Sequence, residues 1–192
     1  MPTLTVIVGS TRPGRAGRPI AEWFVERARR QGDFEVDLAD LAEIRLPLFD
    51  EPEHPRLRRY VNDHTKDWSA RVDKADAVVF VTPEYNFGYP AVLKNAIDYL
   101  HSEWNDKAAG FVSYGGVAAG TRAVQQLKQV VTTLRMVPVV DSVNVPFHAQ
   151  FMGGDGVFRP NEPLDAAADA MLSELNRLDG ALRTLREARR VA

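Results

Sequence analysis

The sequence contains no cysteine, which excludes disulfide bonds, thiolate metal sites and a cysteine nucleophile. It also has no apolar run long enough to cross a bilayer, and its first residues show no basic segment followed by an apolar one. We therefore expect a cytoplasmic protein without a membrane partner. The four histidines lack the spacing typical of metal ligands, so no metal site is predicted.

The chain has little excess of either charge, with a formal net charge of −2. Nucleic acids and anionic membranes attract proteins with a marked positive charge, so neither is expected as a partner. The 192 residues are 45% hydrophobic and 26% charged, an ordinary composition for a globular protein. Length and composition predict one domain over residues 1–192, with enough chain to bury a sizeable core.

Short apolar segments alternate with amphipathic ones along the chain. The pattern predicts strands at residues 4–8, 34–38, 77–81, 107–114 and 137–145. Helices are predicted at residues 19–31, 56–73, 90–100, 121–134 and 164–191, and residues 42–55 are predicted to form a proline-punctuated loop. Five strands alternating with helices indicate an α/β sandwich with a parallel sheet and right-handed crossovers.

The most informative stretch, residues 82–100, follows the fully apolar strand at 77–81. A polar and aromatic turn with Pro83, Glu84, Tyr85 and Asn86 leads from this strand into an amphipathic helix. Ligands of open α/β sheets bind at the carboxyl ends of the strands, so the turn is predicted to form a platform for a flat aromatic ligand. Glu84 is interpreted either as a polar wall of the pocket or as an acid at an interface.

The loop after the first strand, residues 9–18, is rich in hydroxyl groups, glycines and arginines. It is not a GxGxxG motif, because Thr11 occupies the third position, and no Gly-Lys-Ser/Thr follows to make it a Walker A loop. Hydroxyl donors, helix amides and guanidinium groups suit a terminal phosphate monoester. We predict a phosphate site, with a solvated turn as the alternative. The candidate side chains are Ser10, Thr11, Arg12, Arg15 and Arg18.

A third turn, Ser113-Tyr114-Gly115-Gly116, lies at the carboxyl end of the fourth predicted strand. Paired glycines allow backbone amides to approach a ring edge closely, although an ordinary glycine-rich turn has the same sequence. Together the three turns predict a site that holds a phosphate at one end and an aromatic ring at the other. FMN in a flavodoxin-like sheet, bound where the strand order reverses, has this combination of groups.

The motifs GSTRPGR, PEYN-x-GYP-x-x-LKNAIDYL and SYGG resemble those of the NAD(P)H-dependent FMN reductase family, over about residues 3–145. The resemblance implies a flavodoxin-like three-layer sandwich with strand order 2-1-3-4-5 and helices on both faces. It implies FMN and NADPH or NADH as cofactors, and a flavin, quinone or azo compound as the acceptor. The family is usually dimeric or tetrameric, so the resemblance also implies a homodimer or homotetramer with the active site near the interface.

The resemblance also assigns roles to individual positions. Ser10, Arg12 and Arg18 match the family's phosphate contacts, together with Thr11, Arg15 and Gly17. Pro83, Glu84, Tyr85 and Asn86 match the turn that lines the isoalloxazine ring, and Ser113, Tyr114, Gly115 and Gly116 match the second wall of the site. No catalytic acid or base is assigned, because hydride transfer is the chemistry of the flavin itself.

The expected activity is an NAD(P)H oxidoreductase with ping-pong kinetics, in which donor and acceptor use the same face of the flavin in turn. The alternatives are a flavodoxin-like electron carrier without its own NAD(P)H turnover, or a flavin-binding sensor. Phe87, Phe147, Phe151 and the loop at 146–161 are expected to influence the choice of acceptor. Trp104, with Tyr99 and Leu100, is interpreted as an exposed aromatic anchor for a partner subunit.

Overall fold

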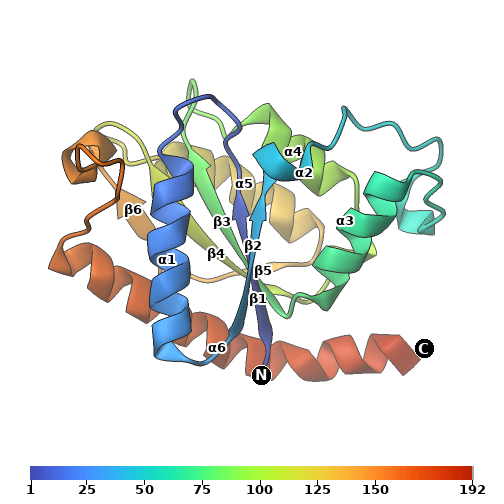
Figure 1. Cartoon of the computed structure of the whole chain (residues 1–192). Helices are drawn as coiled ribbons and strands as arrows, with labels where there is room; N and C mark the ends of the chain where they lie inside the picture. The colour runs from blue at the N-terminus through green and yellow to red at the C-terminus, as the bar shows by residue number, and fades with distance from the viewer. Residues whose placement is uncertain (192) are drawn as a thin grey trace.

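The computed structural model describes the backbone of residues 1–191 and the side chains of residues 1–189; the last residue of the predicted domain, residue 192, lies outside this range. The centre of the molecule is a parallel sheet in the flavodoxin-like order β2-β1-β3-β4-β5 (Figure 1). Its strands are β1 (Thr3–Val8), β2 (Glu35–Asp40), β3 (Ala77–Pro83), β4 (Ala108–Tyr114), β5 (Val137–Pro138) and β6 (Val143–Val145). The predicted fold class is confirmed.

The strand register brings the predicted turns to one edge of the sheet. Val8, at the end of β1, lies opposite Val81 of β3, and Pro83, at the end of β3, lies opposite Tyr114 of β4. All three strands run in the same direction, so the loops that follow them leave the sheet side by side. In Figure 1 this edge is at the top, and the amino terminus is at the bottom.

Helices cover both faces of the sheet. On one face, α1 (Gly17–Gln31) and the long α6 (Glu162–Val191) pack on the core that includes Phe24 and Met171. On the other, α2 (Leu41–Ile44), α3 (Asp63–Lys74), α4 (Ala91–Asp98) and α5 (Thr121–Thr133) enclose a second core around Phe80 and Trp104. Short 3₁₀ helices are η1 (Pro55–Leu57), η2 (Ser102–Trp104) and η3 (His148–Phe151). None of the described helices combines the length and apolar composition needed to cross a membrane.

The predicted fifth strand forms in two pieces. β5 pairs with the start of β4 and β6 with its end, and both pairings are parallel. The chain leaves the sheet between them, where Val140 is 88% exposed. Pro138 has no amide hydrogen for a ladder, and aspartate, here Asp141, is depleted in strands, so this segment cannot pair continuously.

The helix predicted at residues 56–73 begins only at Asp63. The preceding residues follow an irregular path because Arg58 adopts a positive φ of 51° and the Glu51 carboxylate accepts the main-chain N–H groups of Val61 (2.9 Å) and Asn62 (3.1 Å). Leu57 and Val61, which had the spacing of a helix face, are therefore exposed. The loop predicted at residues 42–55 contains most of the short helix α2 and the first residue of η1.

Trp104 is not an exposed anchor, so that prediction is wrong. Its side chain is fully buried, and its indole N–H donates to the carbonyl oxygen of Ile97 at 3.1 Å. Tyr99 and Leu100 are buried as well. After α4 the chain turns back towards the sheet, so these three large side chains complete the core between α3 and α4.

Candidate functional site

The loops after β1, β3 and β4 meet at the carboxyl edge of the sheet (Figure 1). The hydroxyl group of Ser10, in the first loop, lies 2.8 Å from the Tyr85 hydroxyl in the second. Tyr114, which ends β4, places its ring beneath Gly17 at the start of α1. The three motifs found in the sequence thus form one continuous surface.

The start of α1 is suited to an anion. The residue before the helix is Ala16, no side chain caps the helix, and its first turn contains no acidic residue. The first amide groups of a helix have no partners within the helix, and the helix dipole adds positive potential there. This end of α1 therefore offers donors and a favourable field to a negatively charged group.

The three arginines of the first loop are not equivalent. Arg12 is exposed. Arg15 pairs with Asp40 at 2.6 Å, and Arg18 pairs with Asp40, Glu22 and Glu43 at 3.0, 2.6 and 2.7 Å. Arg18 is therefore held on the side of β2 and α2, whereas Arg12 is the arginine best placed to contact a ligand.

The Asp40 carboxylate holds the first loop in place through its ion pairs with Arg15 and Arg18. Burial opposes its ionisation, but the amide of Ala42 and the guanidinium groups of Arg15 and Arg18 outweigh this effect and lower the pKa of Asp40. The carboxylate is therefore charged over the physiological range. Asp40 could not be recognised from the sequence, because an acidic residue at the end of an edge strand gives no signal of its own.

Gly17 and Tyr114 form a close contact that leaves no room for another side chain. A Cβ atom at Gly17 would lie 2.6 Å from the Tyr114 hydroxyl oxygen. This hydroxyl is buried and has no hydrogen-bond partner among the described residues, and burial raises its pKa above the usual value of 10. A neutral donor without an acceptor, next to the start of α1, fits a phosphate oxygen.

The turn after β3 is a tight hairpin. The N–H group of Tyr85 donates to the carbonyl oxygen of Gly88 at 2.8 Å, and the reverse bond measures 2.9 Å. Asn86 and Phe87, between them, both have positive φ angles, 50° and 71°. Asparagine tolerates this left-handed conformation, but phenylalanine does not favour it. The turn therefore exposes Tyr85, Asn86 and Phe87 at the edge of the site in a strained backbone.

Glu84 connects this hairpin to α5. Its carboxylate forms an ion pair with the guanidinium of Arg122 and accepts the main-chain N–H of Arg122 at 3.2 Å. The same guanidinium lies over the Phe87 ring, 3.8 Å from its centroid. The Glu84 carboxylate is thus directed towards the protein. Arg122 could not be recognised from the sequence either, because a single arginine in the first turn of a helix has many uses.

The turn after β4 is largely engaged with its neighbours. The Ser113 hydroxyl donates to the side-chain oxygen of Asn144 at 3.0 Å, and the Gly115 N–H donates to the carbonyl oxygen of Val145 at 3.2 Å. These two groups therefore support the wall of the site. Gly116 is exposed, and a Cβ there would meet no atom within 4 Å, so this glycine lies at the open side of the turn.

The loop at 146–161 packs against this third turn. The main-chain N–H of His148 donates to the Gly115 carbonyl oxygen at 3.3 Å, and its ring lies edge-on to Tyr114 with the centroids 5.4 Å apart. Phe147, which precedes His148, and Val117, which follows Gly116, are 50% and 80% exposed. Together with Phe87 they give the site an exposed apolar rim.

A cleft of about 300 Å³ borders the first loop at Thr11. It is lined by Leu41 and Ala42 of α2, by Arg45 and Leu46 after this helix, and by Val92, Asn95 and Ala96 of α4. Within the described part of the chain, no group of three histidine, aspartate or glutamate side chains is arranged to hold a metal ion.

The profile of a protein family described as NADPH-dependent FMN reductase matches residues 2–150. An NAD(P)H-dependent FMN reductase of Schizosaccharomyces pombe is 42% identical to the chain over 149 residues, which are 76% of this chain and 74% of the relative. A quinone reductase of Pseudomonas putida is 31% identical over 140 residues, covering 70% of this chain and 72% of the relative.

Among solved structures, the flavoenzyme NAD(P)H:(acceptor) oxidoreductase FerB from Paracoccus denitrificans superimposes with a TM-score of 0.74. The alignment covers 92% of this chain and 98% of FerB, at 24% sequence identity. At that identity the likeness concerns the fold.

Proposed function

The chain belongs to the NADPH-dependent FMN reductase family, and on this premise we propose that it binds FMN at the three joined turns and uses it to oxidise NADPH or NADH. The observation that carries the proposal is the meeting of these turns at one edge of the sheet, with a buried Tyr114 hydroxyl left unpartnered beside the start of α1. A phosphate would supply the missing acceptor. Family membership and geometry support the same cofactor.

The first loop would hold the FMN phosphate. Ser10, Thr11, the Tyr114 hydroxyl and the first amides of α1 supply neutral donors, and Arg12 supplies a charged one. Arg15 contributes positive charge from its pair with Asp40. Arg18 and Gly17 act on the shape of the loop, Arg18 through its carboxylate partners and Gly17 by leaving space for the Tyr114 ring.

The other two turns would hold the flavin ring. Pro83 and Tyr85 line one side, the Asn86 amide serves the polar edge of the ring, and Gly116 lets the main chain approach from the other side. Glu84, Ser113 and Gly115 hold these walls in place through Arg122, Asn144 and Val145. This division of labour refines the roles implied by the sequence resemblance.

When bound, FMN supplies the redox chemistry, accepting a hydride from the nicotinamide and passing the electrons to a second substrate. The chain's residues orient the donor and the acceptor and keep the reacting face accessible through the rim of Phe87, Val117 and Phe147. One open rim admits one flat substrate at a time, so we propose ping-pong kinetics. Initial rates at several acceptor concentrations should give parallel double-reciprocal lines; converging lines would contradict a shared binding face.

The acceptor is proposed to be a flavin, a quinone or an azo compound. The exposed apolar rim, with the aromatic rings of Phe87 and Phe147, suits a flat, largely apolar acceptor. In steady-state assays with NADPH and each acceptor class, replacing Phe147 with alanine should raise KM for the acceptor more than KM for NADPH. Sustained NADPH oxidation by the pure protein separates this enzyme from an electron carrier, which would need a partner protein to be reduced.

We also propose that the chain forms a homodimer or homotetramer through the segment at 46–49 and α4. Leu48 is 85% exposed, and Phe49 and Val92 are 40% and 37% exposed, beside the cleft at Thr11. The backbone that carries Leu48 is held firmly: the Asn95 side chain bonds to the carbonyl oxygen of Pro47 (2.7 Å) and the N–H of Phe49 (2.9 Å). An exposed leucine on an ordered backbone is suited to contact another subunit.

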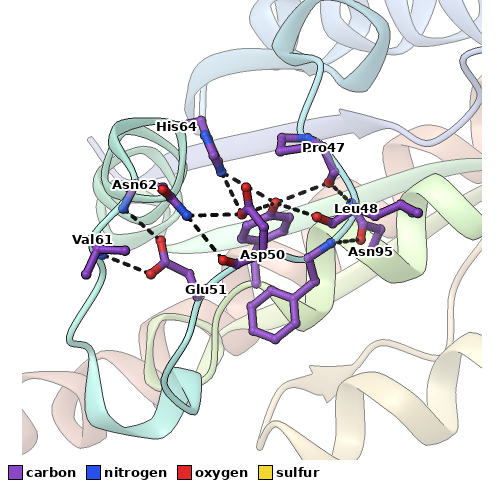
Figure 2. A network of polar contacts seen from close by, with 10 residues as sticks. Pro47, Leu48, Asp50, Glu51, Val61, Asn62, His64 and Asn95 are labelled. Atoms are coloured by element: carbon purple, nitrogen blue, oxygen red, sulfur yellow. Dashed lines mark hydrogen bonds and ion pairs between the residues drawn. The ribbon is translucent and has the colours of Figure 1, made fainter.

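A polar network centred on Asp50 fixes the end of this segment (Figure 2). The Asp50 carboxylate accepts from the Tyr99 hydroxyl at 2.9 Å and from the Asn62 amide at 3.2 Å, and it lies 3.0 Å from a ring nitrogen of His64.

Sedimentation of Leu48→Glu tests the proposed subunit interface. The variant should be smaller than the unchanged protein, whereas the control Leu57→Glu, also at an exposed leucine, should assemble normally. Equal masses for all three would contradict this interface.

A further inference from the structure

We propose that Arg122 is a positioning residue for the flavin ring, acting through the Tyr85–Gly88 turn without touching the ring itself. The inference rests on the proposed FMN site and adds to it a residue outside the three sequence motifs. It starts from the backbone of the turn, where Asn86 and Phe87 have φ angles of 50° and 71°. Phenylalanine disfavours this conformation, so contacts from outside the turn add to the stabilisation that its two main-chain hydrogen bonds provide.

Arg122 supplies these contacts on both sides of the turn. Its guanidinium and main-chain N–H both reach the Glu84 carboxylate, whose side chain is only 7% exposed. The guanidinium carbon, Cζ, also lies over the Phe87 ring, 3.8 Å from its centroid. Arginine can pair with a carboxylate and stack on an aromatic ring at once, whereas lysine cannot reproduce this geometry. Glu84 and Phe87, which flank Tyr85 and Asn86, are thus held by one side chain.

The start of α5 is itself fixed to the opposite wall of the site. Gly120, the residue before the helix, has a φ of 81°, and a Cβ there would lie 2.9 Å from both the Ser113 Cβ and the Tyr114 nitrogen. The first turn of α5 contains no acidic residue, so Glu84 brings to it the negative charge that a helix N-terminus favours. Through Gly120 and Arg122, α5 sets the spacing between the turns after β3 and β4.

This arrangement separates Arg122 from the phosphate contacts. Loss of its guanidinium should let the Phe87 backbone relax and displace Tyr85 and Asn86, whereas the first loop should keep its geometry. The affinity for FMN and for riboflavin, which has the same ring but no phosphate, should then fall by the same factor. A residue that bound the phosphate would affect FMN alone.

The test compares Arg122→Ala, Arg122→Lys and the control Arg29→Ala, which removes an exposed arginine from the last turn of α1. Flavin fluorescence titrations measure the dissociation constants for FMN and riboflavin, and visible circular dichroism reports the surroundings of the bound ring. For Arg122→Ala we expect both flavins to bind about tenfold more weakly, with an altered dichroism spectrum. Arg122→Lys should be intermediate, and Arg29→Ala should match the unchanged protein.

A second variant distinguishes positioning from a general loss of structure. Glycine adopts positive φ without strain, so Phe87→Gly combined with Arg122→Ala should recover most of the lost affinity for both flavins. Equal binding by Arg122→Ala and the unchanged protein would overturn the inference, as would a loss confined to FMN or the absence of rescue by Phe87→Gly. If the unchanged protein bound neither flavin, the proposed function itself would fail, which is a different result.

Discussion

The hydroxyl groups of Ser10 and Tyr85 lie 2.8 Å apart, although 75 residues separate them in the chain. Ser10 is buried two residues after the end of β1, and Tyr85 is exposed two residues after the end of β3, the neighbouring strand. The bond therefore joins the loop proposed to hold the phosphate to the turn proposed to hold the ring. A ligand that binds one of them is placed relative to the other.

Tyr85→Ala should change the absorption and dichroism spectra of bound FMN, because it removes the aromatic side chain beside the ring. Tyr85→Phe keeps this ring and removes only the bond to Ser10, so it should bind FMN with a spectrum close to that of the unchanged protein. Visible spectroscopy of the two loaded variants makes the comparison. If Tyr85→Ala left the spectrum unaltered, Tyr85 would not lie next to the flavin.

Arg12→Ala should weaken FMN binding by about 10- to 100-fold, the effect of losing one charge-assisted bond to a phosphate. Riboflavin binding should not change, which is the opposite of the pattern expected for Arg122→Ala. The melting temperature of the ligand-free protein should also be unchanged, because Arg12 is exposed. FMN affinity equal to that of the control Arg29→Ala would remove Arg12 from the phosphate site.

The order of the elements and the meeting of the three turns at one edge of the sheet could be predicted from the sequence, because both depend on local patterns. The apolar run at 77–81 and the proline and glycine residues after it predict a buried strand and a turn at its end, and β3 ends at Pro83. The glycines and hydroxyl groups after β1 likewise predicted the loop before α1. Parallel strands then bring such turns to one edge without further information.

The partners of the site residues could not be predicted in the same way. Arg12 and Arg18 are of the same residue type and belong to the same loop sequence, yet only the structure shows that Arg18 pairs with Asp40, Glu22 and Glu43. The late start of α3 likewise depends on the hydrogen bonds that the main-chain N–H groups of Val61 and Asn62 donate to Glu51, ten and eleven residues earlier in the chain. Such contacts join segments that are separated in the sequence and are brought together only by the fold.

Arg186 should contribute strongly to stability, far from the proposed site. It is buried at the amino-terminal edge of the sheet, where it pairs with the buried Asp179, donates to the Asp106 carbonyl oxygen at 2.9 Å and reaches Asp76 at 3.1 Å. Arg186→Ala leaves Asp179 buried without its main partner, which should lower the free energy of unfolding by about 3–5 kcal/mol. Urea denaturation measures the change.

Arg177→Ala is the matched control on the same helix. Arg177 pairs with Glu174 at 2.6 Å, but its side chain is 70% exposed. Water and salt screen such a pair, so its removal should leave the urea midpoint nearly unchanged. Similar midpoints for Arg177→Ala and Arg186→Ala would show that the buried network does not hold α6 to the sheet.

Lys107 should make stability rise with pH in mildly basic solution. Burial lowers the pKa of its amino group from 10.5 to about 8, against the attraction of the Asp73 carboxylate. Between these two pH values the unfolded chain binds a proton that the folded chain does not, so raising the pH favours the folded state. Below pH 8 the Lys107 amino group is protonated in both the folded and the unfolded state, so the folded state bears the full free-energy cost of burying this charge.

Lys107→Met removes this titration. Relative to the unchanged protein, the variant should be more stable by about 2 kcal/mol at pH 7, and the difference should shrink as the pH rises from 8 to 10. Urea denaturation at several pH values measures both the stability difference and its dependence on pH. A stability difference independent of pH would mean that Lys107 has the same pKa in the folded and unfolded chains.

The proposal that the chain is an FMN-dependent reductase is tested by the visible spectrum of the purified protein, recorded after FMN addition and desalting and again after anaerobic addition of NADPH. We expect oxidised flavin absorption at about 450 nm to be retained and then bleached by NADPH, as for a flavin that accepts hydride. Retained flavin that NADPH and NADH both fail to bleach would contradict the reductase. Absence of bound flavin would contradict the site itself.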